Sequence, residues 1–175
     1  MTIINCKCIP EIIDVPEKLN IDNYKKYEDD LYQILKQDFV DHEVIFLGKR
    51  VYLDFNKIEN GKSDTFFHVV CGDKKAYPNF RRMERIKFPR QIIENYNECT
   101  SCIESCKIKM FYKKIKGKHR YHLFSKEYRY MVVLEDEGKR MKLVTSFYVD
   151  KGYMLHNYDN DYKNYIQENE DGAIN

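Results

Sequence analysis

The sequence has few of the features that divide or anchor a chain. Only 7 glycines and 4 prolines occur in 175 residues, and no repeat, low-complexity tract or flexible linker interrupts it. The longest apolar runs, at 66–71 and 130–134, are much shorter than a membrane-spanning helix, and no basic start leads into a signal segment. We therefore expect a single cytoplasmic domain over residues 1–175, with no membrane partner.

Motifs of several enzyme classes are also absent. The sequence has no glycine-rich phosphate loop, no H-E-x-x-H pair and no G-x-S-x-G segment. Nucleotide hydrolysis, metalloprotease chemistry and α/β-hydrolase chemistry therefore have no support from motifs.

The composition is that of a folded protein, and its charge is unevenly distributed. Hydrophobic residues make up 43% of the chain and aromatic residues 14%, which is enough for a core. Residues 1–70 carry a net charge of −4 (9 Lys and Arg, 13 Asp and Glu), residues 71–129 carry +10 (16 and 6), and residues 130–175 carry −4 (5 and 9). The basic middle favours a phosphate-rich partner, and the alternative is a solvated face balanced by acidic neighbours.

Apolar spacing predicts three helices. Residues 22–40 repeat apolar side chains at helical intervals, and Asp22 can cap the first turn. A short helix is expected from Pro89, because a proline in the first turn lacks only an N–H that would have no partner there. Residues 158–167 are expected to form a closing helix.

Strands are predicted between these helices. Residues 44–47 and 50–55 flank Gly48, and a β-rich run at 65–70 follows the turn signal at 60–61. A hairpin is also expected over 130–149, around a turn at 136–139.

The clearest hairpin is predicted over 108–125, where a two-residue turn at Lys116 and Gly117 sets Phe111 opposite His122. Because side chains alternate along a strand, one face of this hairpin is apolar and forms core. The other face is basic and aromatic, with Lys109, Phe111, Lys113, Arg120, His122 and Phe124.

These elements together predict an α+β fold, in which an N-terminal helix and short helices pack on a small antiparallel β-sheet. Residues 1–43 form the N-terminal helical segment, 44–157 the α+β core, and 158–175 a C-terminal helix or tail.

Several short segments resemble a family of phage- and mobile-element-associated nucleases, the group that includes barnase, EndoU, colicin and RelE-like enzymes. The resemblance covers roughly residues 44–157. The segments that carry it are Thr65-Phe66-Phe67-His68, Arg81-Arg82-Met83-Glu84-Arg85-Ile86, Phe88-Pro89, Ile92-Ile93-Glu94-Asn95, Tyr130-Met131-Val132-Val133-Leu134-Glu135 and Val144-Thr145-Ser146-Phe147-Tyr148.

The resemblance implies a small antiparallel sheet with helices on one face. It also implies metal-independent RNA cleavage by a few His, Arg, Lys, Thr or Tyr side chains on the open face. Catalytic residues differ between members of this group, so each candidate in this chain must be judged by its own chemistry.

The candidate catalytic residues are those that can transfer a proton or stabilise charge at a phosphate. We select His68, Arg81, Arg85, His122 and Thr145. His68 lies in an apolar β-rich run and could instead be structural. The arginines could instead pair with acidic neighbours.

The candidate RNA-binding residues are cationic or aromatic side chains near these positions. We select Arg82, Arg90, Lys109, Lys113, Arg120, Phe111 and Tyr148. If residues 81–85 are helical, the arginines at 81, 82 and 85 share one side. The basic hairpin face, with Phe111 available to stack on a base, is the expected RNA surface. Thr145 and Tyr148 have odd spacing and therefore face opposite sides of their strand.

Six cysteines in a chain without a signal segment are expected to be reduced thiols. Cys99, Cys102 and Cys106 form a C-x2-C-x3-C cluster, which could supply three ligands of a structural zinc site if a fourth is found elsewhere. Ordinary loop cysteines are the alternative, and no catalytic cofactor is expected.

The sequence therefore predicts a cytoplasmic endoribonuclease of the phage or toxin type, a hydrolase-class enzyme that acts on RNA. An enzyme that damages cellular RNA would require a neutralising acidic protein partner. The rival prediction is a non-catalytic nucleic-acid-binding or protein-interaction module that uses the same basic face.

Overall fold

The structure is a computed structural model that describes residues 12–17, 20–72, 77–98 and 108–172. Its helical elements, in chain order, are α1 (Ile21–Lys36), the π-helical turn η1 (Gln37–Asp41), α2 (Asp64–Val70), α3 (Phe80–Met83), α4 (Phe88–Glu98) and α5 (Gly152–Gly172). Its strands are β1 (Ile45–Phe46), β2 (Lys49–Tyr52), β3 (Ile58–Glu59), β4 (Lys62–Ser63), β5 (Lys109–Ile115), β6 (Lys118–Ser125), β7 (Tyr130–Asp136) and β8 (Met141–Tyr148). The α+β class predicted from the sequence is confirmed.

The main sheet has six strands in the order β1-β2-β8-β7-β6-β5, and β3 and β4 form a separate hairpin. All neighbouring strands of the main sheet are antiparallel except β2 and β8, which run parallel. The expected purely antiparallel sheet is therefore corrected to a mixed one. The parallel pair joins segments about 90 residues apart in the chain, which local periodicity cannot reveal.

The predicted hairpins are confirmed. In β5–β6, Phe111 pairs with His122 and Lys113 with Arg120. Lys116 and Gly117 both have positive φ, as a tight two-residue hairpin turn requires. In β7–β8, Val144 is an extra residue opposite the Val133–Leu134 step, so β8 is bulged there.

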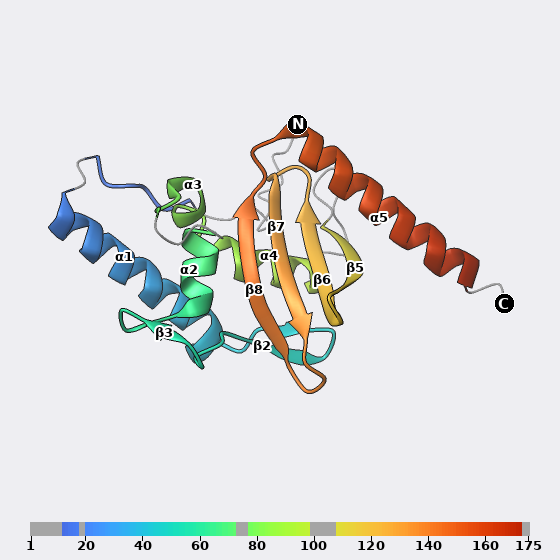
Figure 1. Ribbon diagram of the computed structural model, residues 1–175, viewed down its shortest axis with the longest axis horizontal. Coiled ribbons are helices and arrows are strands. Elements are labelled where there is room, and N and C mark those ends of the chain that lie inside the picture. The colour runs from blue at the N-terminus through green and yellow to red at the C-terminus, as the bar shows by residue number, and fades with distance from the viewer. Residues whose placement is uncertain (1–11, 18–19, 73–76, 99–107, 173–175) are drawn as a thin grey trace.

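The predicted N-terminal helix is present, but its cap is Asn20 and not Asp22. The Asn20 side chain accepts a hydrogen bond from the backbone N–H of Asn23 at 2.8 Å. The buried face of α1 includes Tyr27, Leu31 and Leu35, which join the larger core with side chains from α2, α3, α4 and the sheet. Helix α4 begins around Pro89, as predicted, and crosses behind the sheet in Figure 1.

The predicted strand at 65–70 is wrong, because these residues form helix α2. Ser63 caps it by accepting a hydrogen bond from the N–H of Phe66 at 3.3 Å, and Asp64 in the first turn complements the helix dipole. A short apolar run does not distinguish a strand from a buried helix. Phe66, Val69 and Val70 are fully buried against the rest of the core.

The opposite face of the sheet carries a smaller core, which α5 covers. Phe111, Phe124, Met131 and Val133 are buried there and pack against aromatic side chains of α5, including Tyr158. The helix predicted at 158–167 is confirmed and is longer than expected. Its C-terminal half extends past the sheet (Figure 1).

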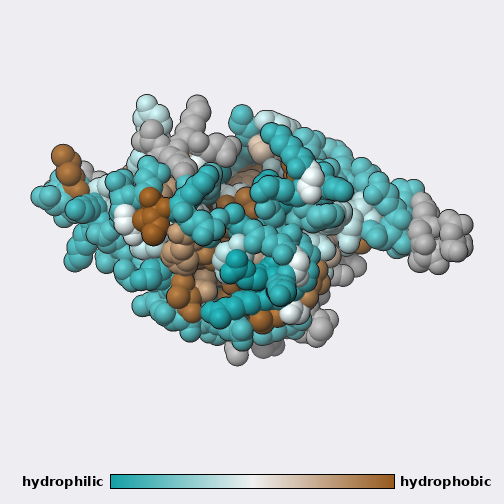
Figure 2. Space-filling model, turned by 60° about the horizontal axis from the view of Figure 1, so that its bottom comes forward, coloured by the Kyte–Doolittle hydropathy of each residue, from teal (hydrophilic) through white to brown (hydrophobic). Residues whose placement is uncertain are grey.

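Within the part of the chain that the structure describes, no helix combines the length and apolar character needed to cross a membrane. The face shown in Figure 2 is largely hydrophilic, with small separate hydrophobic patches.

Candidate active site

A charged cleft of about 100 Å³ lies between α2 and the part of the sheet face beside the smaller core. Strands β6, β7 and β8 contribute its floor, and α2 contributes one wall. The residues that line it are Asp54, Asp64, Thr65, His68, Lys118, Arg120, Glu135, Lys142 and Val144. The bulge at Val144 lies within this cleft, and such bulges redirect side chains next to functional sites.

His68 is the one imidazole among the side chains that line the cleft. It lies one helical turn after Asp64, and its Nε2 atom is 3.3 Å from Asp64 Oδ2. The side chain is 37% exposed, so it is accessible from solvent. A carboxylate that holds an imidazole in this way orients the ring and stabilises it when it is protonated. The sequence identified His68, but it missed Asp64 because the segment was read as a strand.

Three cations and two further carboxylates make up most of the remaining lining, so that with Asp64 the cleft has three of each charge. Lys142 Nζ lies 2.6 Å from Asp54 Oδ2, Lys118 Nζ lies 2.8 Å from Glu135 Oε1, and Arg120 Nε lies 3.1 Å from Glu135 Oε2. With His68 neutral the cleft is balanced in formal charge. Protonation of His68 makes it positive.

Pairing keeps Glu135 and Lys142 charged near neutral pH. Burial opposes ionisation of Glu135, but hydrogen bonds from Lys118 and Arg120 outweigh it, so the pKa of Glu135 lies below its usual value. Burial likewise opposes the charge on Lys142, and Asp54 more than compensates, so the pKa of Lys142 is raised. Lysine at this position therefore acts as a fixed positive charge.

Thr145 and Arg82 meet beside the backbone of His68. The Thr145 hydroxyl donates to the His68 carbonyl at 3.0 Å, and Arg82 Nη1 donates to the same carbonyl at 3.0 Å and to the Ser146 carbonyl at 3.1 Å. These two predicted site residues thus fix α2 against β8. Gly72 beside them has a φ of +77°, a left-handed conformation that favours glycine, and a Cβ there would also lie 2.9 Å from the Arg82 guanidinium carbon.

The predicted grouping of Arg81, Arg82 and Arg85 on one helix side is only partly correct. Helix α3 ends at Met83, so Arg85 lies beyond it. Arg81 and Arg85 both lie over the ring of Tyr148, at 5.4 and 4.6 Å from its centroid. They are therefore brought together with Tyr148, while Arg82 contacts the backbone near His68.

The basic face of the β5–β6 hairpin was expected to be open, and this expectation is wrong because α5 covers it. Lys109 pairs with Asp159, and Lys113 Nζ lies 2.6 Å from Asp161 Oδ2, both on α5. Phe111 is buried beneath that helix. Among the predicted hairpin residues, Arg120 reaches the charged cleft.

His122 is buried beneath α5 and does not line the cleft. Its ring stacks on Phe111 with 4.8 Å between centroids and 3° between planes. Burial, followed by the charges of Lys113 and Arg120, lowers the pKa of His122 from 6.5 to about 4. It is therefore a neutral core histidine at physiological pH.

We expect His122 to make the protein less stable in mild acid. Its folded pKa lies below its unfolded pKa, so its contribution is complete above pH 6.5 and is lost as the pH falls toward 4. The loss by pH 4 should be about 3 kcal/mol. Urea unfolding at pH 7, 5.5 and 4.5 measures it. His122→Gln should remove this part of the pH dependence. His156→Gln, at an exposed site on α5, is the control and should retain it. The same dependence of unfolding free energy on pH in both variants would contradict the burial of a neutral imidazole.

Arg90 belongs to the framework on the other face. It pairs with Asp38 at 3.1 Å and with Glu94 at 2.9 Å, and so joins η1 to α4. Arg90 does not line the charged cleft, so the structure adds no support to its predicted role in RNA binding.

The predicted zinc ligands Cys99, Cys102 and Cys106 lie outside the described residues. Within the described ranges, no three His, Cys, Asp or Glu side chains are grouped so that they could hold a metal ion. Cys71 is partly exposed and is not part of a disulfide.

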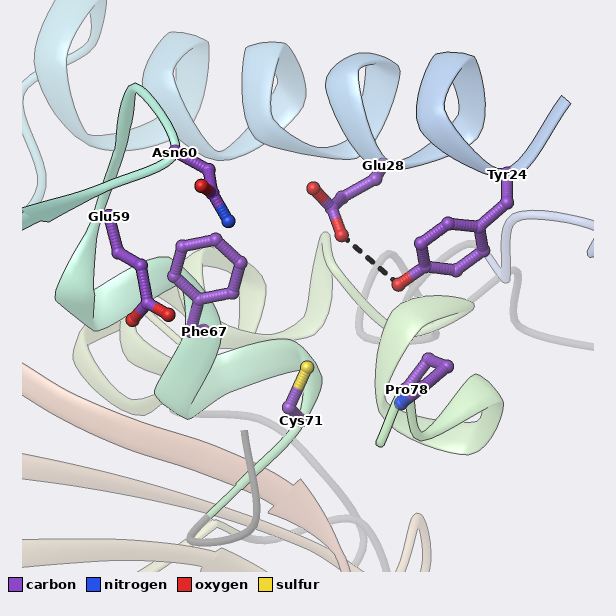
Figure 3. Close-up of a pocket in the computed structure, with 7 residues that line it drawn as sticks. All are labelled: Tyr24, Glu28, Glu59, Asn60, Phe67, Cys71 and Pro78. Carbon is purple, nitrogen blue, oxygen red and sulfur yellow. Dashed lines mark hydrogen bonds between the residues drawn. The ribbon is translucent and has the colours of Figure 1, made fainter. Parts of the chain in front are cut away.

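A second hollow, of about 320 Å³, lies between α1, α2 and the β3–β4 turn (Figure 3). Glu28 and Glu59 contribute carboxylates to it, and the Tyr24 hydroxyl donates to Glu28 at 3.0 Å. Burial, followed by the charge of Glu28, raises the pKa of Tyr24. The residues lining this hollow include no cation, so its chemistry does not suit a phosphate.

Comparison of the chain with protein-family models, with curated proteins and with solved structures finds no match.

Proposed function

We propose that the protein is a metal-independent endoribonuclease whose active site is the charged cleft. The observation that carries this proposal is the shared position of His68, oriented by Asp64, and the cations Lys118, Arg120 and Lys142. Proton transfer and stabilisation of phosphate charge are the two requirements of this reaction.

The proposed reaction uses the RNA's own 2′-hydroxyl as the nucleophile. His68 accepts its proton, the 2′-oxygen bonds to phosphorus, and the bond from phosphorus to the 5′-oxygen breaks. The leaving 5′-oxygen takes a proton from water, and the hydroxide that forms takes the proton held by His68, which returns to its neutral form. The products are a 2′,3′-cyclic phosphate and a 5′-hydroxyl.

Lys118 is the cation best placed to meet the phosphate. Its side chain is 55% exposed, and an exposed ion pair contributes only about 0–1 kcal/mol. It can therefore exchange Glu135 for a phosphate oxygen at small cost. Glu135 keeps its bond to Arg120, so no buried carboxylate is left unpaired.

The test of this mechanism is its dependence on the 2′-hydroxyl. In the presence of a chelator, the protein should cleave an RNA oligonucleotide and leave the same sequence with 2′-deoxyribose intact. Gel analysis of both substrates measures this difference. Equal cleavage of the two would show that the 2′-hydroxyl is not the nucleophile.

A second candidate function is RNA binding without cleavage. It is favoured by the cluster of arginines around Tyr148, which lies apart from His68 and contains no imidazole or carboxylate among these four side chains. Intact RNA that is bound in a salt-sensitive way would support this function.

The toxin or phage association remains part of the proposal, and with it a neutralising acidic partner. Such a partner would lower activity by occupying Lys118 and Arg120 at the cleft. The described residues of α5 already show this chemistry on the adjacent hairpin, where Asp159 and Asp161 pair with lysines.

A further inference from the structure

Three arginine side chains surround the ring of Tyr148 at the end of β8. The guanidinium carbons of Arg81, Arg85 and Arg129 lie 5.4, 4.6 and 5.5 Å from the ring centroid. The negative face of an aromatic ring attracts guanidinium groups at this range. The ring therefore helps to hold three like charges together.

Two of these arginines brace the cluster. Arg129 donates to the carbonyls of Val149 at 3.0 Å and Asp150 at 2.5 Å, which fixes the segment after β8. Arg85 pairs with Glu84, and its side chain is largely buried. Their guanidinium groups are held in place by the protein itself.

Arg81 is the member that faces solvent. Its side chain is 62% exposed, and its Nη1 atom lies 2.6 Å from Oδ1 of Asp150, which is also exposed. An exposed pair of this kind contributes little to stability. A phosphate could replace the Asp150 carboxylate, because a guanidinium binds both groups with the same forked geometry.

A groove of about 500 Å³ adjoins Arg81. It is lined by Cys71, Tyr77, Pro78, Asn79, Phe80, Arg81 and Asp150. The side chains of Tyr77 and Phe80 are prominent in it, because these residues are 72% and 39% exposed. Exposed aromatic rings beside a guanidinium are the combination by which proteins bind single-stranded nucleic acid, with bases stacked and phosphates paired.

The groove is connected to the charged cleft through β8. Val144 lines the cleft and packs against the smaller core, whereas Tyr148, four residues and about 13 Å further along the strand, contacts the arginines and packs against the larger core on the other face of the sheet. Arg82 lies between them, bonded to the carbonyls of His68 and Ser146.

We propose that this groove and the arginine cluster form a second nucleotide-binding subsite for single-stranded RNA, separate from the charged cleft. Arg81 binds a backbone phosphate, and Tyr77 and Phe80 stack against a base. The claim that the ligand is RNA rests on the proposed function. The claim that the groove binds a phosphate and a base rests on the residues that line it.

The test measures binding separately from cleavage, with a fluorescent single-stranded oligonucleotide of 2′-deoxyribose, which the proposed reaction cannot cleave. Arg81→Ala should weaken binding several-fold and lower the slope of log affinity against log salt by about 0.7, the value of one phosphate contact. Tyr77→Ala should weaken binding about tenfold with an unchanged slope. Arg140→Ala is the matched control. The guanidinium carbon of Arg140 also lies over a tyrosine ring, 3.9 Å from the centroid of Tyr52, but neither residue lines the groove, so this change should leave binding unchanged.

The outcomes separate this subsite from the proposed nuclease. Loss of affinity in both variants supports the subsite even if wild-type protein leaves RNA intact. If RNA is cleaved, the same variants should raise KM and leave kcat near wild type, because they act on binding away from the reacting bond. Wild-type affinity in Arg81→Ala and Tyr77→Ala, or no binding of the oligonucleotide by wild-type protein, would overturn the subsite whether or not RNA is cleaved.

Discussion

Replacing His68 with alanine is expected to reduce the rate of RNA cleavage by about 10²–10⁴-fold, the usual contribution of a positioned general base. His68 is the histidine that lines the charged cleft, and its side chain is partly exposed there. The variant should fold normally, because α2 is anchored by Phe66, Val69 and Val70 and not by the imidazole.

His42→Ala is the matched control for this prediction. His42 is also a partly exposed histidine bound to a carboxylate, with its Nε2 atom 3.0 Å from Glu94 Oε1, but it lies outside the cleft. Its loss should leave the cleavage rate unchanged. Asp64→Asn should give an intermediate loss, because the imidazole remains but loses its orienting charge. Equal activities of the His68 and His42 variants would remove His68 from the mechanism.

Replacing Phe111 with alanine is expected to lower the free energy of unfolding by about 3–5 kcal/mol, the usual cost of emptying the space of a buried phenylalanine. Its ring is 1% exposed and lies between His122 and Tyr158 of α5. The sequence-based hypothesis placed this ring on an open face, where alanine would weaken RNA binding and leave stability nearly unchanged. Chemical denaturation distinguishes these two positions directly.

The comparison for Phe111 is Phe55→Ala, at a phenylalanine that is 42% exposed. This change should shift stability by about 0.5 kcal/mol or less. A loss of stability in Phe111→Ala no larger than in Phe55→Ala would mean that α5 does not cover the hairpin in solution.

Local patterns predicted the hairpins well. The register of β5 and β6 follows from one tight turn at Lys116 and Gly117, and alternation then determines the face of every side chain. What alternation does not determine is which face another element will cover. Both faces of this hairpin are buried in part, and the segment that covers the basic face comes from α5, about 40 residues later.

Two pairs of the charged cleft, Asp64 with His68 and Lys142 with Asp54, were not predicted from the sequence, and the causes are related. Read as a strand, residues 65–70 separate Asp64 from His68, whereas a helix places them one turn apart on the same side. The cap at Ser63 was the available signal. Lys142 and Asp54 could not be placed in the site from the sequence, because their contact depends on the parallel pairing of β2 with β8.

The arginines illustrate a different limit. Their clustering in the sequence correctly indicated a concentration of charge, but neighbouring arginines perform different tasks. Arg82 binds main-chain carbonyls, Arg90 joins two helical elements, and Arg81 remains accessible. Only the tertiary arrangement determines which guanidinium is available to a ligand.

The measurement that tests the account most directly is end-group analysis of fragments made from total cellular RNA, including transfer RNA, by the purified protein in the presence of a chelator. The account predicts discrete fragments that end in 2′,3′-cyclic phosphate and begin with a 5′-hydroxyl, and their absence with His68→Ala. RNA left intact by the wild-type protein, or fragments with 5′-phosphate ends, would contradict it.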